Sequence, residues 1–376
     1  MREIKINIEN IRSSLNKLGI NQTELAKKVD VSKEAVSQWL KGEKVPRPAK
    51  LLQLSKLLGL NYDDLVSREK SNVPIVAYRT NKNKKLTEEQ QLRAQDMGEM
   101  LQVLLPYLNG DSVFTAPVIS NPVLDDDYIQ KVSSEIRKRF GLNSKEITFS
   151  EIMNLYSDFR IVLIPVMWGE NGDNGLYISL PENQITFVYA NLEKVITDFK
   201  FWLLHELAHT MTPALQGEDS EKFADSFAAA TLFPRDLAEK TYDELSKIRQ
   251  PGIIINRIKE LASKYVISPY TILGEMKKYT HSFSKPVVSI DMGGAVTNFN
   301  KHVGLVSEII FGEEHPDAEK YITTCNRTLG TDFFYALSCY IKDNKKEAGI
   351  VQRIMNIPMA DAKGVHRTLV EKTDFT

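Results

Sequence analysis

Apolar residues recur at helical spacing in short blocks along the N-terminal part of the chain. The blocks lie between residues 8 and 65, and they are separated at Gly19, Asp30, Gly42 and Gly59. Apolar positions three or four residues apart form one face of a helix, and Gly or Asp between such blocks marks helix ends. The pattern therefore predicts an all-α bundle of about five short helices.

A basic segment without apolar residues follows this bundle, at residues 79–85. Such a composition is typical of a linker, and helical periodicity resumes at residues 88–108. A chain of 376 residues also exceeds what one hydrophobic core usually organises. We therefore predict a multidomain protein that begins with a helical domain at residues 1–70, followed by a linker and helix at residues 71–110.

Strands and helices are mixed in the middle of the chain. Short runs rich in β-branched and aromatic residues predict strands, and longer amphipathic stretches predict helices. These elements are, in order, strands at residues 161–166, 175–180 and 185–189 and helices at residues 193–211 and 219–232. Residues 181–184 have the composition of a hairpin turn between the last two strands. We predict that residues 111–284 form an α+β domain.

The remaining segment, residues 285–376, differs in character from the middle of the chain. It begins with a strand-like run at residues 287–290 and continues after a break at Gly293 and Gly294. The two glycines lack the spacing of a phosphate-binding loop. We predict a smaller C-terminal α/β domain here, to which the sequence assigns no role.

Charge and cysteine content narrow the class of protein. Residues 1–70 contain 14 Lys and Arg against 9 Asp and Glu, which leaves a charge of +5 there and −6 on the rest of a chain of net charge −1. A basic head is typical of a DNA-contacting domain. Two cysteines, Cys325 and Cys339, are too few for the disulfide framework of a secreted protein. With no signal sequence and no run of about 18 apolar residues, we expect a cytoplasmic protein that does not bind a membrane.

Within the N-terminal bundle, two short helices are predicted to form a helix-turn-helix. The first covers residues 22–29, and Ser32 caps the second, which covers residues 33–40. Small Ala26 permits close contact between the helices, and Val36 helps to fix their crossing. The second helix is expected to present four side chains to base edges, with three others placed for phosphates. The base-reading set is Lys33, Glu34, Ser37 and Gln38, and the phosphate set is Gln22, Lys41 and Lys44.

The same segment carries an ordered set of motifs. They are Gln-Thr-Glu-Leu-Ala at residues 22–26, Val-Ser at 31–32, Ser-Gln-Trp at 37–39, then Gly42, Pro46 and a stripe of Leu51, Leu54, Leu57 and Leu58. Across residues 8–66 the chain closely resembles the Xre/Cro-type repressor family. The resemblance implies double-stranded operator DNA as a partner and dimers on palindromic operators. The sequence shows no dimer interface, so it does not decide whether the chain forms a homodimer. A bundle that mainly holds a partner protein is the alternative.

A second motif lies on the helix predicted at residues 193–211. His205 and His209 are four residues apart, so both imidazoles lie on one helix face and can bind one metal ion. Glu206 follows the first histidine, where its carboxylate can act as general base on a water bound to that ion. A motif this short also arises by chance in packed helices, so its context decides.

Two acidic residues of the next predicted helix supply that context. Glu221 follows His209 by twelve residues and can return a carboxylate to the histidine pair as third ligand. Asp225 lies one helical turn further on, placed to accept the free ring N–H of a ligating histidine. The set predicts one Zn²⁺ ion per chain, with manganese or another divalent metal as the alternative.

The sequence around these residues adds a family resemblance. The runs His-Glu-Leu-Ala-His at 205–209, Glu-Lys-Phe-Ala-Asp-Ser-Phe-Ala at 221–228 and Leu-Phe-Pro at 232–234 strongly resemble the ImmA/IrrE metallopeptidase family. Phe233 stands where that family more often has Met. The resemblance covers about residues 145–240 and implies a zincin-like fold. It further implies a helix-turn-helix repressor as protein substrate, Glu206 as general base, and the zinc ligands His205, His209 and Glu221.

Two parts of a peptidase site remain open in the sequence. The edge strand that pairs with an extended substrate backbone is either residues 175–180 or residues 185–189. The oxyanion donor has four candidates, and any lone His or Tyr is more often a packed or surface residue. These candidates are Tyr177, Tyr189, His281 and His302.

Together, these features predict a transcriptional regulator of bacterial or phage type with a zinc-dependent endopeptidase domain, which cleaves a repressor-type protein or itself. The alternative is a DNA-binding regulator or antitoxin-like protein whose zincin fold is a non-catalytic sensing or partner-binding scaffold. The presence of Glu206 favours the enzyme, because a structural zinc site does not need a general base.

Overall fold

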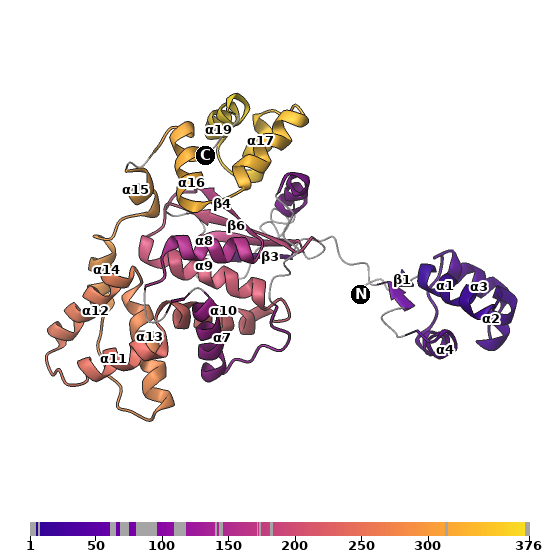
Figure 1. The fold of residues 1–376 in the computed structure, drawn as a ribbon, viewed down its shortest axis with the longest axis horizontal. Helices are drawn as coiled ribbons and strands as arrows, with labels where there is room; N and C mark the ends of the chain where they lie inside the picture. Colours follow the sequence, from indigo (N-terminus) through magenta and orange to yellow (C-terminus); the bar gives the residue numbers. More distant parts are fainter. Residues whose placement is uncertain are drawn as a thin grey trace. The chain divides into compact units, whose positions relative to one another are not determined.

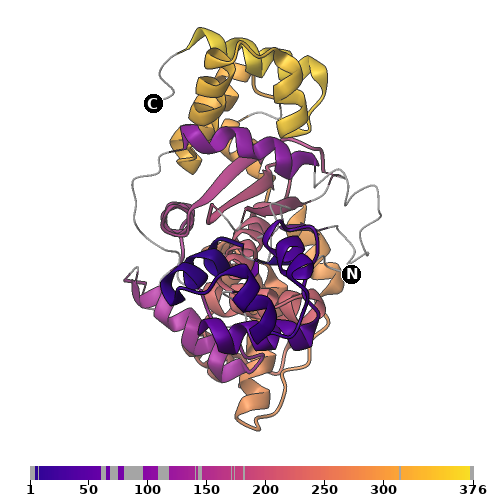
Figure 2. The ribbon, with the colours of Figure 1, turned by 90° about the vertical axis from the view of Figure 1, so that its right-hand side faces the viewer.

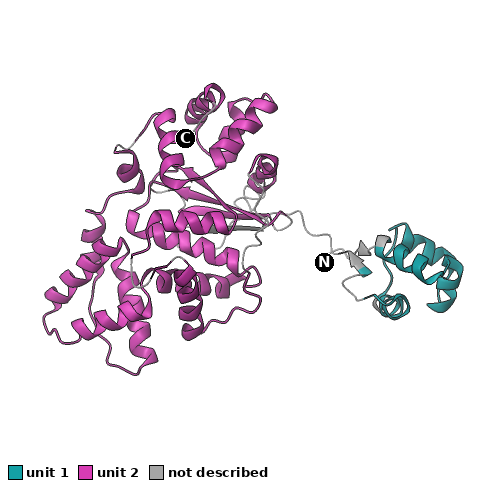
Figure 3. Ribbon diagram, viewed as in Figure 1, with its two compact units in different colours: residues 1–73 teal, residues 74–376 magenta. Residues whose placement is uncertain are grey.

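The chain divides into two compact units in the computed structural model, residues 1–73 and residues 74–376 (Figure 1, Figure 3). The structure describes residues 5–6, 8–60, 65–67, 75–79, 96–108, 118–139, 141–142, 146–170, 172, 174–180, 183–312 and 315–372. The sequence placed the first boundary at residue 70, close to the division between the units. The predicted linker at residues 79–85 lies, except for Arg79, outside the described residues.

Unit 1 is a small helical bundle. Its described helices are α1 (Ile8–Leu18), α2 (Gln22–Lys28), α3 (Lys33–Leu40) and α4 (Pro48–Leu58). Apolar side chains from all four helices form its core. Two short strands, β1 (Lys5–Ile6) and β2 (Val66–Ser67), pair antiparallel, and the sequence did not predict them. The last predicted helical block, after Gly59, lies mostly outside the described residues.

Hydrogen bonds at the helix ends fix the helix-turn-helix. Asn21 and Glu24 form a reciprocal cap on α2, in which each side chain accepts from the other residue's backbone N–H. Ser32 caps α3 by accepting from the N–H of Ala35 at 3.1 Å, as the sequence predicted. Lys50, from α4, donates its Nζ to two carbonyl oxygens of the turn between α2 and α3, at 2.8 and 3.0 Å.

Unit 2 is built on a sheet that has four strands among the described residues. They are β3 (Ile75–Arg79), β4 (Ile161–Val166), β5 (Gly175–Leu180) and β6 (Ile185–Asn191), in the spatial order β3-β5-β6-β4. β5 is antiparallel to β3 and to β6, whereas β4 is parallel to β6. The three strands predicted from the sequence are present, and β3 is an addition.

The prediction that β5 or β6 forms the edge of the sheet is wrong. β3 covers the outer side of β5, and β4 covers the outer side of β6, so both predicted candidates are central. The strand-forming residues 75–78 form a short run directly before the basic segment. A run of that length beside a linker-like composition is not distinguishable from the linker itself, because pairing rather than local preference makes an edge strand.

Helices surround this sheet. Residues 96–101 are helical and continue as the 3₁₀ helix η1 (Gln102–Tyr107), which contains Pro106 and therefore cannot keep the α-helical hydrogen bonds predicted to residue 108. The helices that follow, up to residue 284, are α7 (Asp126–Arg139), α8 (Phe149–Asp158), α9 (Ile196–Met211), α10 (Gly217–Leu232), α11 (Arg235–Leu245), α12 (Pro251–Tyr265) and α13 (Pro269–Ser282).

The C-terminal segment is helical, so the predicted α/β character of residues 285–376 is wrong. Its helices are α14 (Gly293–Asn300), α15 (Val306–Phe311), α16 (Ala318–Leu329), α17 (Phe333–Asp343), α18 (Ala348–Met355) and α19 (Met359–Glu371). Residues 287–290 alternate between exposed and half-buried but pair with no strand in the described part of the chain. β-branched residues without a neighbouring strand remain an irregular segment.

The C-terminal helices also belong to unit 2, which corrects the prediction of a separate domain there. Tyr321 donates its hydroxyl to the carbonyl oxygen of Pro165 in β4 at 2.6 Å, and Tyr189 of β6 donates to the carbonyl oxygen of Ile354 at 2.6 Å. One core cluster extends from Met97 to Leu369. Figure 2 shows α16 to α19, in yellow, on one side of the sheet, with the helices of the middle of the chain on the other.

Helix α9 is held at both ends by segments distant in sequence. At its start, residues 304–307 run beside residues 192–196: the N–H of Ile196 donates to Gly304 at 3.2 Å, and the N–H of Val306 donates to Lys194 at 2.9 Å. At its end, the carbonyl of Met211 accepts from the N–H of Ile119 at 2.8 Å. None of the helices in the described part of the chain is long and apolar enough to span a membrane.

Candidate metal centre

Helix α9 lies in the interior of unit 2 because apolar residues surround it on nearly every side. Leu203, Leu204, Leu207 and Ala208 are fully buried, so the polar residues between them are carried into the core. Gly175 lets β5 approach this helix, since a Cβ there would lie 1.9 Å from a ring carbon of Trp202. The metal motif is therefore part of a fixed helix packed against the sheet.

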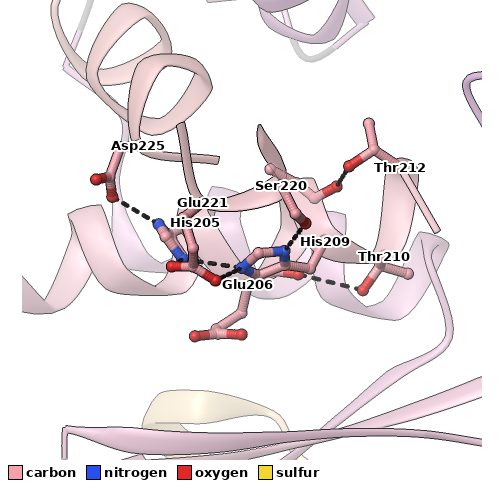
Figure 4. Close-up of polar contacts among 9 residues, drawn as sticks. His205, Glu206, His209, Thr210, Thr212, Ser220, Glu221 and Asp225 are labelled. Atoms are coloured by element: carbon pink, nitrogen blue, oxygen red, sulfur yellow. Dashed lines mark hydrogen bonds and ion pairs between the residues drawn. The ribbon is translucent and has the colours of Figure 1, made fainter. Parts of the chain in front are cut away.

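Three side chains converge at the C-terminal half of α9 (Figure 4). The Nε2 atoms of His205 and His209 lie 2.9 Å apart. From α10, Glu221 places its Oε2 3.4 Å from Nε2 of His205 and its Oε1 3.4 Å from Nε2 of His209. The structure thus brings together the three residues that the sequence singled out as metal ligands.

The opposite ring nitrogens of both histidines are engaged by α10. Asp225 Oδ1 lies 2.9 Å from His205 Nδ1, as expected from the sequence. Ser220 Oγ lies 2.9 Å from His209 Nδ1, a contact that the sequence analysis missed. When the Nδ1–H groups donate hydrogen bonds to Asp225 and Ser220, each Nε2 carries a free lone pair, and the two lone pairs are directed at the same point. Ser220 directly precedes the predicted ligand Glu221 on the same helix. That position could have indicated a hydrogen bond to one of the two histidines.

These donors fit a zinc ion. Two imidazoles and one carboxylate are a common catalytic zinc set, and ligand atoms about 2.0–2.1 Å from a tetrahedral centre are about 3.3 Å apart. The two distances between Glu221 and the histidines match that spacing, and the 2.9 Å between the histidine Nε2 atoms is somewhat shorter. The histidine side chains are 1% and 9% exposed and that of Glu221 is 52% exposed, so the cluster opens to solvent on the side of α10.

Glu206 is buried beside this cluster, with 3% of its surface exposed. Figure 4 shows its carboxylate below the histidine pair, on the side of α9 that faces the strands at the bottom of the view. The negative charge of Glu206 affects the pKa of two tyrosines. Burial and the Glu206 charge both raise the pKa of Tyr156, whose hydroxyl donates to the carbonyl oxygen of Leu203 at 2.8 Å.

Tyr177 is the second of these tyrosines. Burial raises its pKa, and the Glu206 charge adds to the rise, whereas hydrogen bonding with the hydroxyls of Thr210, Thr186 and Ser179 lowers it. Its ring lies 5.9 Å from the ring of His209, centroid to centroid. The phenol therefore stays protonated at neutral pH and remains a hydrogen-bond donor next to the cluster.

The other three oxyanion candidates lie elsewhere. Tyr189 points to the opposite face of the sheet from Tyr177, because its register partner is Leu176, and its hydroxyl is bound to Ile354. His302 is exposed just after α14, and its Nδ1 lies 2.7 Å from the carbonyl oxygen of Asn298 in that helix. His281 is exposed in the last turn of α13. Of the four residues, Tyr177 is the one that contacts a cluster histidine.

The DNA-contact candidates lie on one helix of unit 1 and its flanks. Lys33 and Glu34 are exposed in the first turn of α3, while Ser37 and Gln38 are half-buried one turn later. Gln22 begins α2, Lys41 and Lys44 follow α3, and all three are exposed. Hydrogen bonds from its own backbone N–H and from Ser32 lower the pKa of Glu34, so this one member of the candidate set carries a negative charge.

A cavity lies away from the candidate metal ligands, none of which lines it. Its volume is about 1230 Å³. Met100, Met167 and Trp168 supply apolar and aromatic wall, and Arg353 and Asp361 bring opposite charges from the C-terminal helices. The side chain of Trp168 is fixed there, since it stacks on Tyr189 and donates its indole N–H to Met355.

Comparison with known proteins identifies the first unit. Residues 11–65 match the family model described as helix-turn-helix, which is of the Xre type. No curated protein and no solved structure matches the chain. The match covers unit 1 alone, so the metal centre of unit 2 stands on its own geometry and the ImmA/IrrE resemblance stays a prediction. The helix-turn-helix match supports a DNA-binding transcription regulator.

Proposed function

We propose that unit 2 is a zinc-dependent endopeptidase of zincin-like fold, carried by a DNA-binding transcription regulator. One observation carries the proposal. The Nε2 atoms of His205 and His209 converge with the Glu221 carboxylate while α10 engages both Nδ1 atoms, and buried Glu206 adjoins the same turn of α9. Structural zinc sites use four protein ligands, whereas three ligands beside a buried carboxylate suit hydrolysis.

Each residue around the cluster has a separate role in the proposed hydrolysis. A zinc ion held by His205, His209 and Glu221 supplies the Lewis acidity that amide hydrolysis needs at neutral pH. Glu206 takes a proton from the attacking water and passes it to the leaving nitrogen. Tyr177, kept protonated by burial, donates a hydrogen bond to the carbonyl oxygen as negative charge develops there.

The DNA-binding unit suggests a regulatory protein as substrate. A peptidase attached to an operator-binding head meets repressor-type proteins at their shared sites, and the resemblance to the ImmA/IrrE family points to a helix-turn-helix repressor. This chain carries such a domain itself, so the substrate is either a related repressor or the chain's own inter-unit segment. In unit 1, Lys33, Ser37 and Gln38 are proposed to read bases.

The proposal is tested by metal analysis and a cleavage assay on the purified full chain. Wild type, Glu206→Gln and the control Glu218→Gln are incubated alone and with helix-turn-helix repressors encoded near its gene. Glu218 is exposed and pairs with Lys222, so its substitution leaves the cluster intact. We expect one zinc per chain in all three proteins and a discrete fragment from wild type and Glu218→Gln only. Zinc-loaded wild type that cuts neither itself nor any repressor would contradict the proposal.

The DNA-binding part is tested separately. Replacement of Lys33, Ser37 and Gln38 by Ala should relax the preference among operator sequences, because each direct base contact contributes about 1–3 kcal/mol of discrimination. Salt-dependent binding to nonspecific DNA should change less, since Gln22, Lys41 and Lys44 are proposed to contact phosphates. Unchanged operator preference in a selection from random sequences would show that these three side chains do not read bases.

A second candidate function is favoured by the cavity of about 1230 Å³ beside the C-terminal helices. In this case unit 2 is a sensing scaffold without turnover, and a small ligand bound beside Trp168 and Arg353 controls DNA binding. The two candidates differ in the response to Glu206→Gln. A regulatory output that is unchanged by this substitution favours the scaffold, whereas its loss favours the peptidase.

A further inference from the structure

Strand β5 runs along the helix that carries the metal motif. Gly175 packs on Trp202, and the ring of Tyr177 lies 5.9 Å from that of His209. Alternate strand residues point to the same face of a sheet, so this face of β5 follows α9 from Trp202 to His209. An extended peptide added to the outer edge of β5 would therefore run beside the metal cluster.

That outer edge is already occupied. Strand β3 pairs with it antiparallel, with Ile75 opposite Ser179, Ala77 opposite Tyr177 and Arg79 opposite Gly175. The pairing covers five of the six residues of β5. Backbone groups that would bind an incoming peptide by strand addition are thus engaged by the chain itself.

The occupant is a short segment at the junction of the two units. β3 has five residues and begins at residue 75, directly after unit 1 ends at residue 73. Among the described strands it pairs with β5 alone. A five-residue edge strand can be exchanged for another extended segment without rebuilding the sheet, because β5 keeps its pairing with β6. The segment that fills the edge is continuous with the DNA-binding unit.

We propose that β3 occupies the place of the substrate: it fills the peptide-binding edge of β5 most of the time, so that wild type cleaves slowly, in the fraction of chains from which β3 is withdrawn. The inference rests on the proposed function for its catalytic consequence, but the exchange of one strand for another can be measured without catalysis. The substrate segment is then an extended peptide that pairs antiparallel with β5 and competes with residues 75–79.

The first test measures binding in the absence of turnover. In full-length protein carrying Glu206→Gln, residues 75–79 are replaced by Gly-Ser-Gly-Ser-Gly, and the probe is a fluorescein-labelled peptide with the sequence Pro-Ile-Val-Ala-Tyr-Arg-Thr of residues 74–80. If β3 fills the edge at least nine-tenths of the time, its removal should tighten probe binding by about tenfold or more. Equal affinity for Glu206→Gln with and without the replacement would overturn the inference.

A second test locks the strand without deleting it. Ile75 lies opposite Ser179, so Ile75→Cys with Ser179→Cys places two thiols on directly paired residues, and Ser179→Cys alone is the control. The natural Cys325 is buried, which leaves Cys339 as the native thiol to be monitored by mass spectrometry. Oxidation of the cysteine pair should reduce both probe affinity and the rate of hydrolysis by at least tenfold, and reduction of the disulfide should restore them. Oxidised protein that binds and cleaves like the reduced form would overturn the inference.

The outcomes separate this inference from the proposed function. If the chain with the Gly-Ser replacement binds the probe more tightly but no chain hydrolyses any peptide, the peptidase proposal fails and the occupied edge stands. If wild type, replaced and locked chains all cleave at the same rate, the peptidase stands and the role of β3 is refuted. Zinc content and circular dichroism show whether the chain with the Gly-Ser replacement is folded. If it is not folded, the reversible disulfide between the two introduced cysteines still decides the question.

Discussion

Replacement of Asp225 by Ala tests whether the carboxylate beside His205 strengthens the metal centre. Asp225 Oδ1 lies 2.9 Å from Nδ1 of His205, where it fixes the ring tautomer and orientation. Loss of such a partner typically weakens metal binding by about 10–100-fold, or about 1.4–2.7 kcal/mol. The Asp225 side chain is 53% exposed, so solvent screens its charge and we expect the lower end, about tenfold.

Ser220→Ala provides an internal comparison. Its hydroxyl makes an equally short contact with His209 Nδ1, but the hydroxyl is neutral. A neutral hydrogen bond contributes about 0.5–1.5 kcal/mol, which corresponds to about 2–10-fold in affinity. We therefore expect the order Asp225→Ala, then Ser220→Ala, then wild type, from the weakest to the tightest binding of zinc.

The assay is competition for zinc between the metal-free full chain and a fluorescent chelator at pH 7. Asp219→Ala is the matched control, because Asp219 is exposed in the first turn of the same helix and its loss removes one negative charge without touching a histidine. Circular dichroism checks that α10 is intact. Zinc affinity of Asp225→Ala within twofold of the Asp219→Ala control would refute the argument that this contact orients the ligand.

Three further substitutions probe other parts of unit 2. Tyr177→Phe should lower kcat by about 100-fold or more with zinc affinity unchanged, as for loss of one oxyanion donor; an unchanged kcat would exclude that role. Gly175→Ala should destabilise the fold in thermal denaturation, because its Cβ would collide with the Trp202 ring, whereas Gly274→Ala, with open space, should not. Burial raises the pKa of Glu275, so the folded state binds its proton more tightly and stability falls as pH rises above the ordinary glutamate pKa. Glu275→Gln should flatten this fall as the pH rises above about 4.5 in melting experiments, and an identical pH profile would count against it.

The parts of the candidate site whose arrangement could be predicted from the sequence depend on short separations along the chain. His205 and His209 share a helix face because they are one turn apart, and Glu221 returns to them because α10 follows α9 after a short turn. The predicted helix at residues 193–211 differs from α9 by three residues at its start. Local periodicity determines such features, so a single sequence is enough to find them.

The parts that were missed depend on pairings between distant segments. Tyr177 and Tyr189 look alike in the sequence, but the register of β5 against β6 sends them to opposite faces of the sheet. The edge of β5 is filled by a strand about a hundred residues earlier in the chain, which no local pattern predicts. Residues 287–290 show the converse case, since a strand-like pattern there finds no partner strand within the described ranges.

The anchoring of α9 by residues 304–307 makes the C-terminal segment part of the support of the candidate metal site. A chain that ended after α13 would keep every residue of the metal motif, yet the carbonyl oxygens of Leu192 and Lys194 and the N–H of Ile196 would lose their hydrogen-bond partners. Leaving such groups unsatisfied in the interior costs about 1–3 kcal/mol each. A shorter relative would need another segment in that place, so the C-terminal third is part of the scaffold that makes the metal site and not an accessory added to it.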